Sequence, residues 1–141
     1  MSSNYYVSTN KDKLDIPMIH DFLSNVAYWS KGVPLYRVEK AIEHSLTFGV
    51  YHENTQVGFA RVISDYSTIA YLGDVFILPE YREKGLSKML MEEIMGHTEL
   101  QGMRRWILLT GNAHGLYEQY GWTSLSNTDI YMEKYDAECY D

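Results

Sequence analysis

The feature that most constrains the fold is the order of three segments in the second half of the chain. A long apolar run, Ile69 to Leu78, stops at Pro79; an amphipathic helical pattern follows over Gly85 to His97; a compact apolar strand, Trp106 to Thr110, comes next. A strand, a helix and a second strand in this order form a parallel pair joined by a crossover helix. The sequence therefore predicts a βαβ unit inside a larger sheet.

The first half supplies strands of another kind. Alternation of apolar and polar residues over Leu46 to His52 and Gln56 to Ser64 flanks Glu53-Asn54-Thr55, which predicts a hairpin. The other expected elements are a strand over Tyr5 to Ser8, a helix capped by Asp15 with its apolar face from Ile16 to Val26, a helix opened by Pro34 and ending near His44-Ser45, a short helix over Leu116 to Tyr120, and two last strands over Trp122 to Leu125 and Asp129 to Lys134.

The predicted order is β-α-α-β-β-β-α-β-α-β-β. It describes a mixed α/β sheet of six to seven twisted strands with helices on both faces. The 141 residues contain no internal repeat or linker, so we expect one domain over residues 1–141, with 135–141 as a loose tail.

The composition excludes several classes of function. A net charge of −7 argues against non-specific nucleic-acid binding and against docking on anionic membranes. Five histidines and one cysteine lack metal-ligand spacing, so no metal site is expected. With Cys139 unable to form an internal disulfide and no signal peptide or membrane span recognised, the expected location is the cytoplasm.

The turn after Pro79 carries the clearest chemical signal. The first amides of a helix have no intrahelical acceptors, and the peptide dipoles add positive charge there. Gly85 lets an anion approach this backbone, and Arg82 and Lys84 bring cationic side chains to the same place. The pattern predicts a phosphate or pyrophosphate site. The alternative is that Gly85 only eases a strand-to-helix turn and the cations are solvated.

Two motifs resemble those of GCN5-related N-acetyltransferases (GNAT). Pro79-Glu-Tyr-Arg-Glu-Lys-Gly-Leu-Ser87 resembles the acetyl-CoA loop, Arg/Gln-x-x-Gly-x-Gly/Ala, with Ser87 in place of the final small residue. Asn112-Ala-His-Gly-Leu-Tyr-Glu-Gln-Tyr-Gly-Trp122 resembles the family's later segment that ends in Tyr-x-x-x-Gly-Phe. The resemblance covers residues 46–134 and extends to the preceding helices, and it implies the GNAT fold.

The resemblance implies a cofactor site between two splayed strands, where the pantetheine arm pairs with exposed backbone. Asn112 is expected beside the second strand. The cofactor-binding residues implied are Val75, Phe76, Ile77, Leu78, Arg82, Glu83, Lys84, Gly85, Leu86, Ser87, Lys88, Asn112 and Tyr117. For Lys88, a contact with the ribose 3′-phosphate competes with simple solvation.

By its place in the motif, Tyr117 is the implied general acid that protonates the leaving thiolate; alternatively it only packs against Leu116. Asp74 is the candidate general base, because a carboxylate inside an apolar strand is costly unless it is bonded. An equal alternative is a structural bond to nearby backbone or a tyrosine. His114 is expected to cap a helix or face water.

Acceptor contacts are expected from the connection between the first two helices, although the same aromatic residues could simply close the core. Trp106 and Trp122 are expected to pack. The candidate acceptor-binding residues are Tyr28, Trp29, Lys31 and Tyr36.

The resemblance therefore implies an acetyl-CoA-dependent N-acetyltransferase that moves an acetyl group directly to a primary amine of a small molecule or peptide. The remote Cys139 argues against a covalent cysteine intermediate. The alternatives are a non-catalytic acetyl-CoA sensor or assembly module and, less favoured, a different nucleotide- or phosphate-binding protein. Many family members dimerise, which favours a homodimer, although the sequence itself gives no argument for one.

Overall fold

The computed structural model describes residues 4–140. Its centre is a five-stranded sheet in the order β1-β2-β3-β4-β5, antiparallel from β1 to β4 and parallel between β4 and β5. The mixed sheet and the βαβ unit are therefore confirmed. The strands are β1 (Tyr5–Ser8), β2 (Leu46–His52), β3 (Thr55–Ser64), β4 (Ile69–Ile77) and β5 (Arg105–Leu108).

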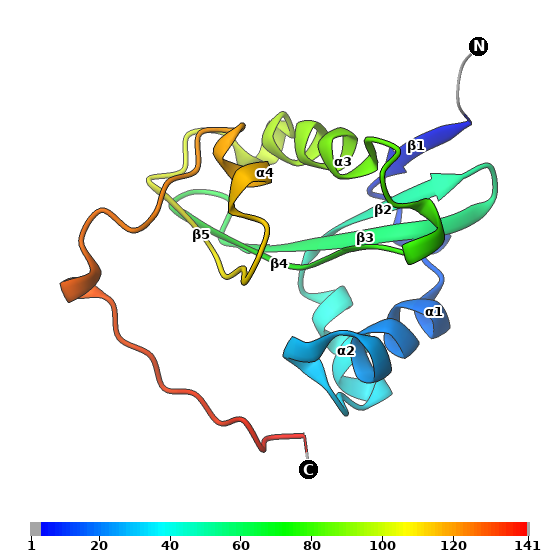
Figure 1. Cartoon of the computed structure of the whole chain (residues 1–141), viewed down its shortest axis with the longest axis horizontal. Coiled ribbons are helices and arrows are strands. Elements are labelled where there is room, and N and C mark those ends of the chain that lie inside the picture. The colour runs from blue at the N-terminus through cyan, green and yellow to red at the C-terminus, as the bar shows by residue number, and fades with distance from the viewer. Residues whose placement is uncertain (1–3, 141) are drawn as a thin grey trace.

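Helices cover both faces of the sheet, as predicted (Figure 1). On one face lie α1 (Ile16–Asp21), which continues as a π-helical turn to Val26, and α2 (Leu35–Glu43). On the other lie α3 (Leu86–Met95) and the short α4 (His114–Glu118). Within residues 4–140 no helix is long and apolar enough to cross a membrane.

Two apolar clusters hold these layers together. One packs α3, through Leu90 and Ile94, on β2, β3 and β4; the other packs α1 and α2 on the opposite face, where the Phe22 ring stacks on Phe76 with centroids 4.0 Å apart. Burial of this kind stabilises by about 1.5–3 kcal/mol per large apolar side chain. As a result β4 is clamped from both faces.

The return from β3 into β4 is fixed by one aspartate. The Asp65 carboxylate accepts hydrogen bonds from the backbone amides of Ser67, Thr68 and Ile69 and from the Thr68 hydroxyl. These donors, led by the Thr68 hydroxyl, lower the pKa of Asp65 far below its usual value. The turn thus sets where β4 begins and, through the ladder, the register of its partners.

The prediction of six to seven strands is wrong for the described residues, because the two expected last strands are absent. Residues 122–125 and 129–134 form no ladder with any described strand. The chain bends at Gly121 (φ +90°), and a single turn of 3₁₀ helix occupies Thr128–Ile130, where the Asn127 side chain accepts from the Asp129 amide. Both segments contain apolar residues, but a strand also requires a neighbouring backbone.

Candidate active site

A wedge opens in the sheet where β4 and β5 separate. The parallel ladder joins Ile69–Leu72 of β4 to Arg105–Leu108 of β5 and ends there, while β4 continues to Ile77 beside β3 alone. From Gly73 onward, the edge of β4 that faces away from β3 therefore has no described strand beside it. Backbone donors and acceptors on such an edge can bind an extended amide chain as an added strand would.

A β-bulge lies at the point of separation. The pairing of β3 with β4 passes from Arg61 opposite Gly73 to Phe59 opposite Phe76, so the register shifts across Asp74 and Val75. Asp74 has φ +54°, a left-handed conformation that costs a non-glycine residue about 1 kcal/mol. The bulge turns β4 away from β5 and thereby creates the wedge.

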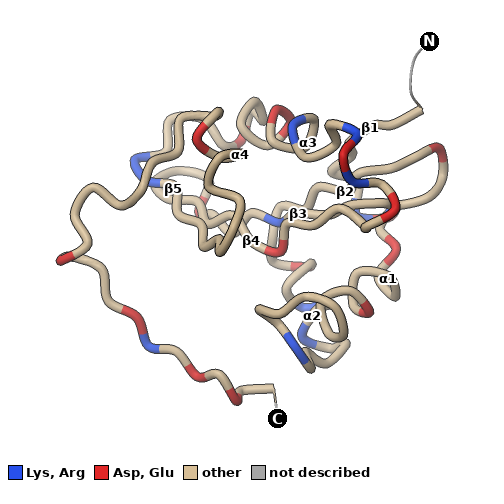
Figure 2. Tube along the Cα trace, viewed as in Figure 1, with Lys and Arg blue, Asp and Glu red and all other residues tan. Residues whose placement is uncertain are grey.

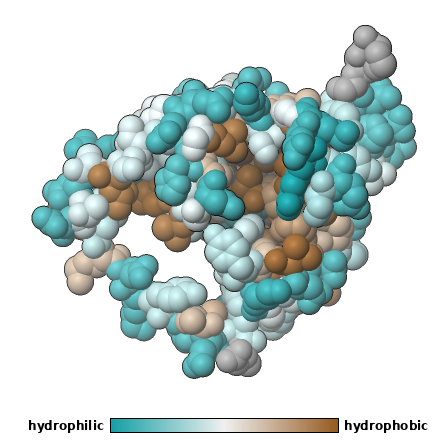
Figure 3. Space-filling model, viewed as in Figure 1, coloured by the Kyte–Doolittle hydropathy of each residue, from teal (hydrophilic) through white to brown (hydrophobic). Residues whose placement is uncertain are grey.

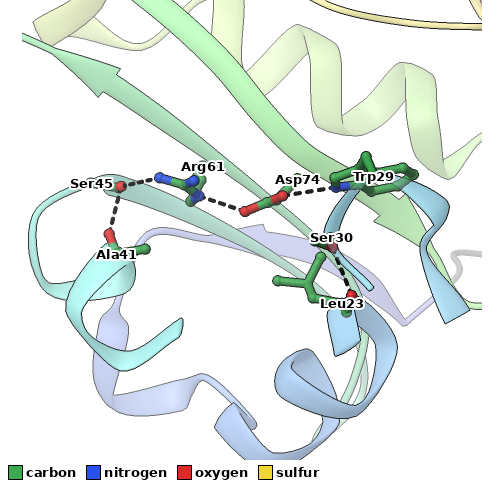
Figure 4. A network of polar contacts seen from close by, with 7 residues as sticks. All are labelled: Leu23, Trp29, Ser30, Ala41, Ser45, Arg61 and Asp74. Carbon is green, nitrogen blue, oxygen red and sulfur yellow. Dashed lines mark hydrogen bonds and ion pairs between the residues drawn. The ribbon is translucent and has the colours of Figure 1, made fainter. Parts of the chain in front are cut away.

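A polar network holds the strained residue in place (Figure 4). Arg61 Nε donates to Asp74 Oδ2 at 2.6 Å, and the Trp29 indole nitrogen donates to Oδ1 at 2.9 Å. Arg61 Nη1 also donates to the Ser45 hydroxyl at 3.1 Å, which in turn donates to the Ala41 carbonyl. The Arg61 and Asp74 side chains are only 20% and 15% exposed, so their opposite charges offset each other's cost of burial.

The predicted phosphate loop connects β4 to α3. Gly85 has φ +78° at the N-cap of α3, and Glu83 two residues earlier has φ +62°. In the described part of the chain no side chain caps this helix end, and a Cβ at Gly85 would meet nothing within 4 Å. Both the left-handed conformation and the open space suit close approach of an anion to the first amides of α3.

The charges of this loop are interleaved, as Figure 2 shows between β4 and α3. Arg82 is exposed and turns back to the strand, with its Nε donating to the Ile77 carbonyl at 3.0 Å. This bond leaves the two terminal guanidinium nitrogens for an anion. Leu86 is buried and anchors α3 in the core, while Ser87 is half-buried and Lys88 exposed.

The side chains of three strand residues do not face the wedge. Phe76 and Ile77 are buried on opposite faces of the sheet, and Leu78 packs beside Phe76. The Leu78 amide donates to the Val57 carbonyl at 2.8 Å and so turns toward β3. We therefore expect these residues to contact a cofactor through their backbone, which is the contact that the resemblance implies. Val75 is half-buried and borders the open side.

Tyr117 lies across the wedge on α4. Its side chain is 8% exposed and packs near Trp122, and burial raises the pKa of its hydroxyl above the usual 10.0. The hydroxyl forms no hydrogen bond with any described protein group. A protonated phenol with a free donor is the state that a general acid requires. Asn112 lies in the exposed loop between β5 and α4.

One cavity of about 1420 Å³ brings most of the predicted catalytic and acceptor residues together. It extends from the wedge toward α2, and Figure 3 shows apolar residues in the hollowed centre of this face. Asp74, Val75, Asn112 and Tyr117 border it, together with Tyr28, Trp29 and Tyr36.

Lys31 and His114 are not brought into this cavity. The Lys31 ammonium donates to the Asn25 carbonyl at 2.8 Å, and Lys31 is absent from the cavity wall, so its predicted acceptor contact is not supported. His114 begins α4 with an exposed side chain, as expected. The tryptophans expected to pack do so: the Trp106 and Trp122 rings meet edge to face at 5.6 Å.

Sequence reasoning missed three residues that shape the site. Arg61 neutralises Asp74, Tyr71 borders the same cavity, and Arg37 reaches it from α2. Burial, with a smaller contribution from the Asp74 charge, raises the pKa of Tyr71. The sequence did contain a signal for Arg61. The consecutive apolar strands β3 and β4 each contain one charged residue, and these two charges, Arg61 and Asp74, are opposite.

Comparison with known proteins agrees with this geometry. Residues 16–122 match the model of the acetyltransferase (GNAT) family. A curated protein of Gibberella zeae, named "Putative acetyltransferase FG08082", is 29% identical over 136 residues, covering 81% of this chain and 76% of that protein.

Solved structures give the same assignment. A crystal structure from Xanthomonas campestris pv. campestris, titled a "putative acetyltransferase belonging to the gnat family", is 51% identical over 96% of both chains, with a TM-score of 0.94. A GNAT-family acetyltransferase from Streptococcus pneumoniae, at 20% identity and TM-score 0.72, covers 94% of this chain and 97% of its own and shows the shared fold alone. The chain is a member of the GNAT acetyltransferase family.

Proposed function

We propose that this protein is an acetyl-CoA-dependent N-acetyltransferase that transfers the acetyl group directly to a primary amine. The observation that carries the proposal is the wedge. The open edge of β4 begins at Gly73–Val75, which border the cavity together with Tyr117, and it leads to the loop before α3, whose residues do not line that cavity. These features fit a ligand with a diphosphate, an amide-containing arm and a thioester.

Backbone amides and one cationic side chain together bind the cofactor. The first amides of α3 and the terminal nitrogens of Arg82 hold the diphosphate, since backbone donors at a helix start favour anions. The open edge of β4 beyond the bulge aligns the amides of the arm. An amide near Val75 or Phe76 is the proposed donor to the thioester oxygen.

Tyr117 is the proposed acid. As the amine nitrogen bonds to the acetyl carbon and the carbon–sulfur bond breaks, the phenol gives its proton to the thiolate. A raised pKa keeps the phenol protonated at neutral pH. Its proton is then replaced from solvent.

Asp74 is the proposed acceptor of the amine proton, directly or through water. Both carboxylate oxygens already accept one hydrogen bond, from Arg61 and Trp29, and each keeps a further lone pair. The same bonds fix the Trp29 indole at the cavity wall, so Asp74 also positions a candidate acceptor-binding residue.

The test compares two tyrosine variants on a panel of primary amines, with CoA release as the measured signal. Tyr117→Phe should lower kcat by about 100-fold or more while the acetyl-CoA dissociation constant stays nearly unchanged. Tyr66→Phe is the matched control, because Tyr66 is 47% exposed in the β3–β4 turn and outside the cavity wall. Its kcat should equal that of the parent.

Three results contradict parts of this proposal. An unchanged kcat in Tyr117→Phe removes the acid role. Tight acetyl-CoA binding with no CoA release from any amine favours the sensor or assembly module instead. Displacement of acetyl-CoA by ATP or NAD at equal concentration indicates a less specific phosphate-binding protein.

A further inference from the structure

One face of α2 borders the cavity of about 1420 Å³, here called the acceptor cavity. Val38 and Ile42 are buried in the core, whereas Arg37, Lys40 and His44 lie on the cavity wall. Positions separated by three and then four residues share one face of a helix, so these three side chains point the same way. Figure 2 shows basic residues along α2, and the helical spacing brings them to the cavity.

The wall of the acceptor cavity carries more positive than negative charge. Arg61 is neutralised by Asp74, and among the described residues Arg37 and Lys40 form no ion pair. Glu133 is the other described carboxylate on this wall. It can offset one of the two α2 cations, so a positive charge remains in a chain whose net charge is −7. A wall of this sign attracts an anionic group.

The Arg37 side chain is held beside aromatic rings. Its guanidinium carbon lies 5.9 Å from the centre of the Tyr36 ring and 5.7 Å from that of Tyr140. A guanidinium that stacks on a ring keeps its N–H donors directed outward in its own plane. Two such donors match the two oxygens of a carboxylate or a phosphate.

Asp74, the proposed acceptor of the amine proton, borders the same cavity at the wedge. Figure 4 shows the path from there to α2, in which Arg61 joins Asp74 to the Ser45 hydroxyl and this hydroxyl donates to the Ala41 carbonyl. Ala41 follows Lys40 directly in the last turn of α2. One guanidinium and three hydrogen bonds, of 2.6, 3.1 and 2.6 Å, therefore connect the reacting end of the cavity to its basic end.

Aromatic side chains form much of the remaining wall. Tyr28, Trp29, Tyr36 and Tyr71 all border the acceptor cavity, and the first three are exposed. The face of an aromatic ring is apolar, so a hydrocarbon linker can pack on it without losing a hydrogen bond. The cavity therefore suits a ligand with a polar group at each end and carbon atoms between them.

We propose that the primary amine acetylated by this protein also carries an anionic group, a carboxylate or a phosphate, which Arg37 and Lys40 bind. The inference rests on the proposed function, because it names the class of acceptor for the same site. The amine donates to a free lone pair of the Asp74 carboxylate, while the anion pairs with the cations of α2. Only one orientation of such an acceptor satisfies both ends, so the anion places the amine at the thioester.

The experiment compares acceptors in matched pairs, with CoA release as the signal. The first set is the ω-amino acids from glycine to ε-aminocaproate, each paired with the alkylamine of the same carbon number. The second set is the aminoalkyl phosphates, each paired with its amino alcohol, and it distinguishes a phosphate from a carboxylate. For the best anionic acceptor, kcat/KM should exceed that of its neutral partner at least about tenfold, mainly through a lower KM.

The variant Arg37→Gln should reduce this preference at least about tenfold, because it removes the paired donors and their charge. Arg104→Gln is the matched control, since Arg104 is equally exposed and lies outside the cavity wall. It should keep the preference of the parent. The acetyl-CoA-induced rise in Tm shows that each variant is folded and binds the cofactor.

The outcomes separate this inference from the proposed function. Acetylation of neutral amines as efficiently as of their anionic partners overturns the inference and leaves acetyl transfer intact. An equal loss of preference in Arg37→Gln and Arg104→Gln also overturns it, because the net charge of the chain would then explain the effect.

If no amine is acetylated, calorimetry with the same anionic amines in the presence of CoA decides the matter. Binding that Arg37→Gln abolishes and Arg104→Gln retains supports the anion site, although acetyl transfer has failed. Absence of binding overturns the anion site as well.

Discussion

The two walls of the wedge are built differently. β4 has nine residues, an antiparallel partner, an apolar cluster on each face and a bulge fixed by an ion pair. β5 has four residues, one partner and an open outer edge, and it leads through an exposed loop into a five-residue helix. Packing on both faces holds the first wall, whereas the second is short and has one described partner strand.

This difference suggests that the two walls have different roles. Backbone that must align a long ligand benefits from rigidity, because ordering it at the moment of binding would reduce affinity. The β5 side carries the proposed acid and borders the acceptor cavity, where some movement is useful. Variants of the β4 side should therefore affect cofactor binding and folding most, and variants of the β5 side should affect turnover.

The largest effect is expected at the end of the β4 wall. Gly85→Val places a Cβ where the diphosphate would approach and strains a left-handed position. We expect acetyl-CoA affinity to fall by about 100-fold or more, which corresponds to losing one or two charge-assisted bonds. The measurement is the acetyl-CoA-induced rise in Tm.

Gly102→Val is the matched control. Gly102 has φ +77° and equally open surroundings, but it lies before β5. The variant should cost about the same stability without ligand, roughly 1 kcal/mol, and keep the full acetyl-CoA shift. Equal loss of the shift in both variants would mean that strain alone, and not a diphosphate contact, accounts for the Gly85 result.

A smaller effect is expected at the ion pair that holds the bulge. Arg61→Met leaves the Asp74 charge half-buried without its cation, and we expect the free energy of unfolding to fall by about 2 kcal/mol. Adding Asp74→Asn removes the unpaired charge and should restore part of the loss. A double-mutant cycle with coupling near zero would show that the pair does not hold the bulge.

The two walls also differ in how far the sequence predicted them. Hydrophobic periodicity was enough for β4 and α3, because their apolar faces meet residues of the same chain and Pro79 ends the strand. Residues 129–134 contain Ile130 and Met132 at strand spacing and were predicted as a strand, yet they form none. Periodicity reports that a segment can be half-buried in a sheet; it does not say which backbone will be its neighbour.

The candidate site shows the same limit at the level of single residues. Gly85 was predicted from the local pattern of a helix start, and Tyr117 from a motif that resembles the family's, so neither needed contacts between residues distant in sequence. The ion pair of Asp74 with Arg61 depends on register between two strands, 13 residues apart in sequence. Sequence singled out the carboxylate as costly, whereas only the fold identified the arginine and the indole that stabilise it.

The β5 wall predicts a particular pH dependence. Because burial raises the pKa of Tyr117 above 10.0, the proton needed by the leaving thiolate is lost only at still higher pH. The pH profile of kcat should therefore show no falling limb from this group below that value, and Tyr117→Phe should remove any fall seen above it. A falling limb near pH 8 that Tyr117→Phe abolishes would contradict the raised pKa, and a fall above 10.0 that persists in Tyr117→Phe would contradict the acid role.

The smallest effect is expected in β2, far from either wall. The Tyr51 side chain is 2% exposed, its hydroxyl has no hydrogen-bond partner among residues 4–140, and burial raises its pKa from 10.0 to about 12. Tyr51→Phe removes an unsatisfied buried donor and should increase the free energy of unfolding at pH 7 by about 1 kcal/mol. Tyr6→Phe is the control, since the stacked Tyr6 ring is 36% exposed and should gain nothing.

The sign of the pH effect makes this last prediction specific. The folded chain keeps the Tyr51 proton to about pH 12, whereas the unfolded chain loses it near 10.0, so the parent loses stability as pH rises between these values. Tyr51→Phe should lose less over the same interval, in urea unfolding followed by tryptophan fluorescence. If the free energy of unfolding falls equally in both proteins, groups other than Tyr51 govern alkaline unfolding. In that case β2 opens enough for the Tyr51 phenolate to reach water.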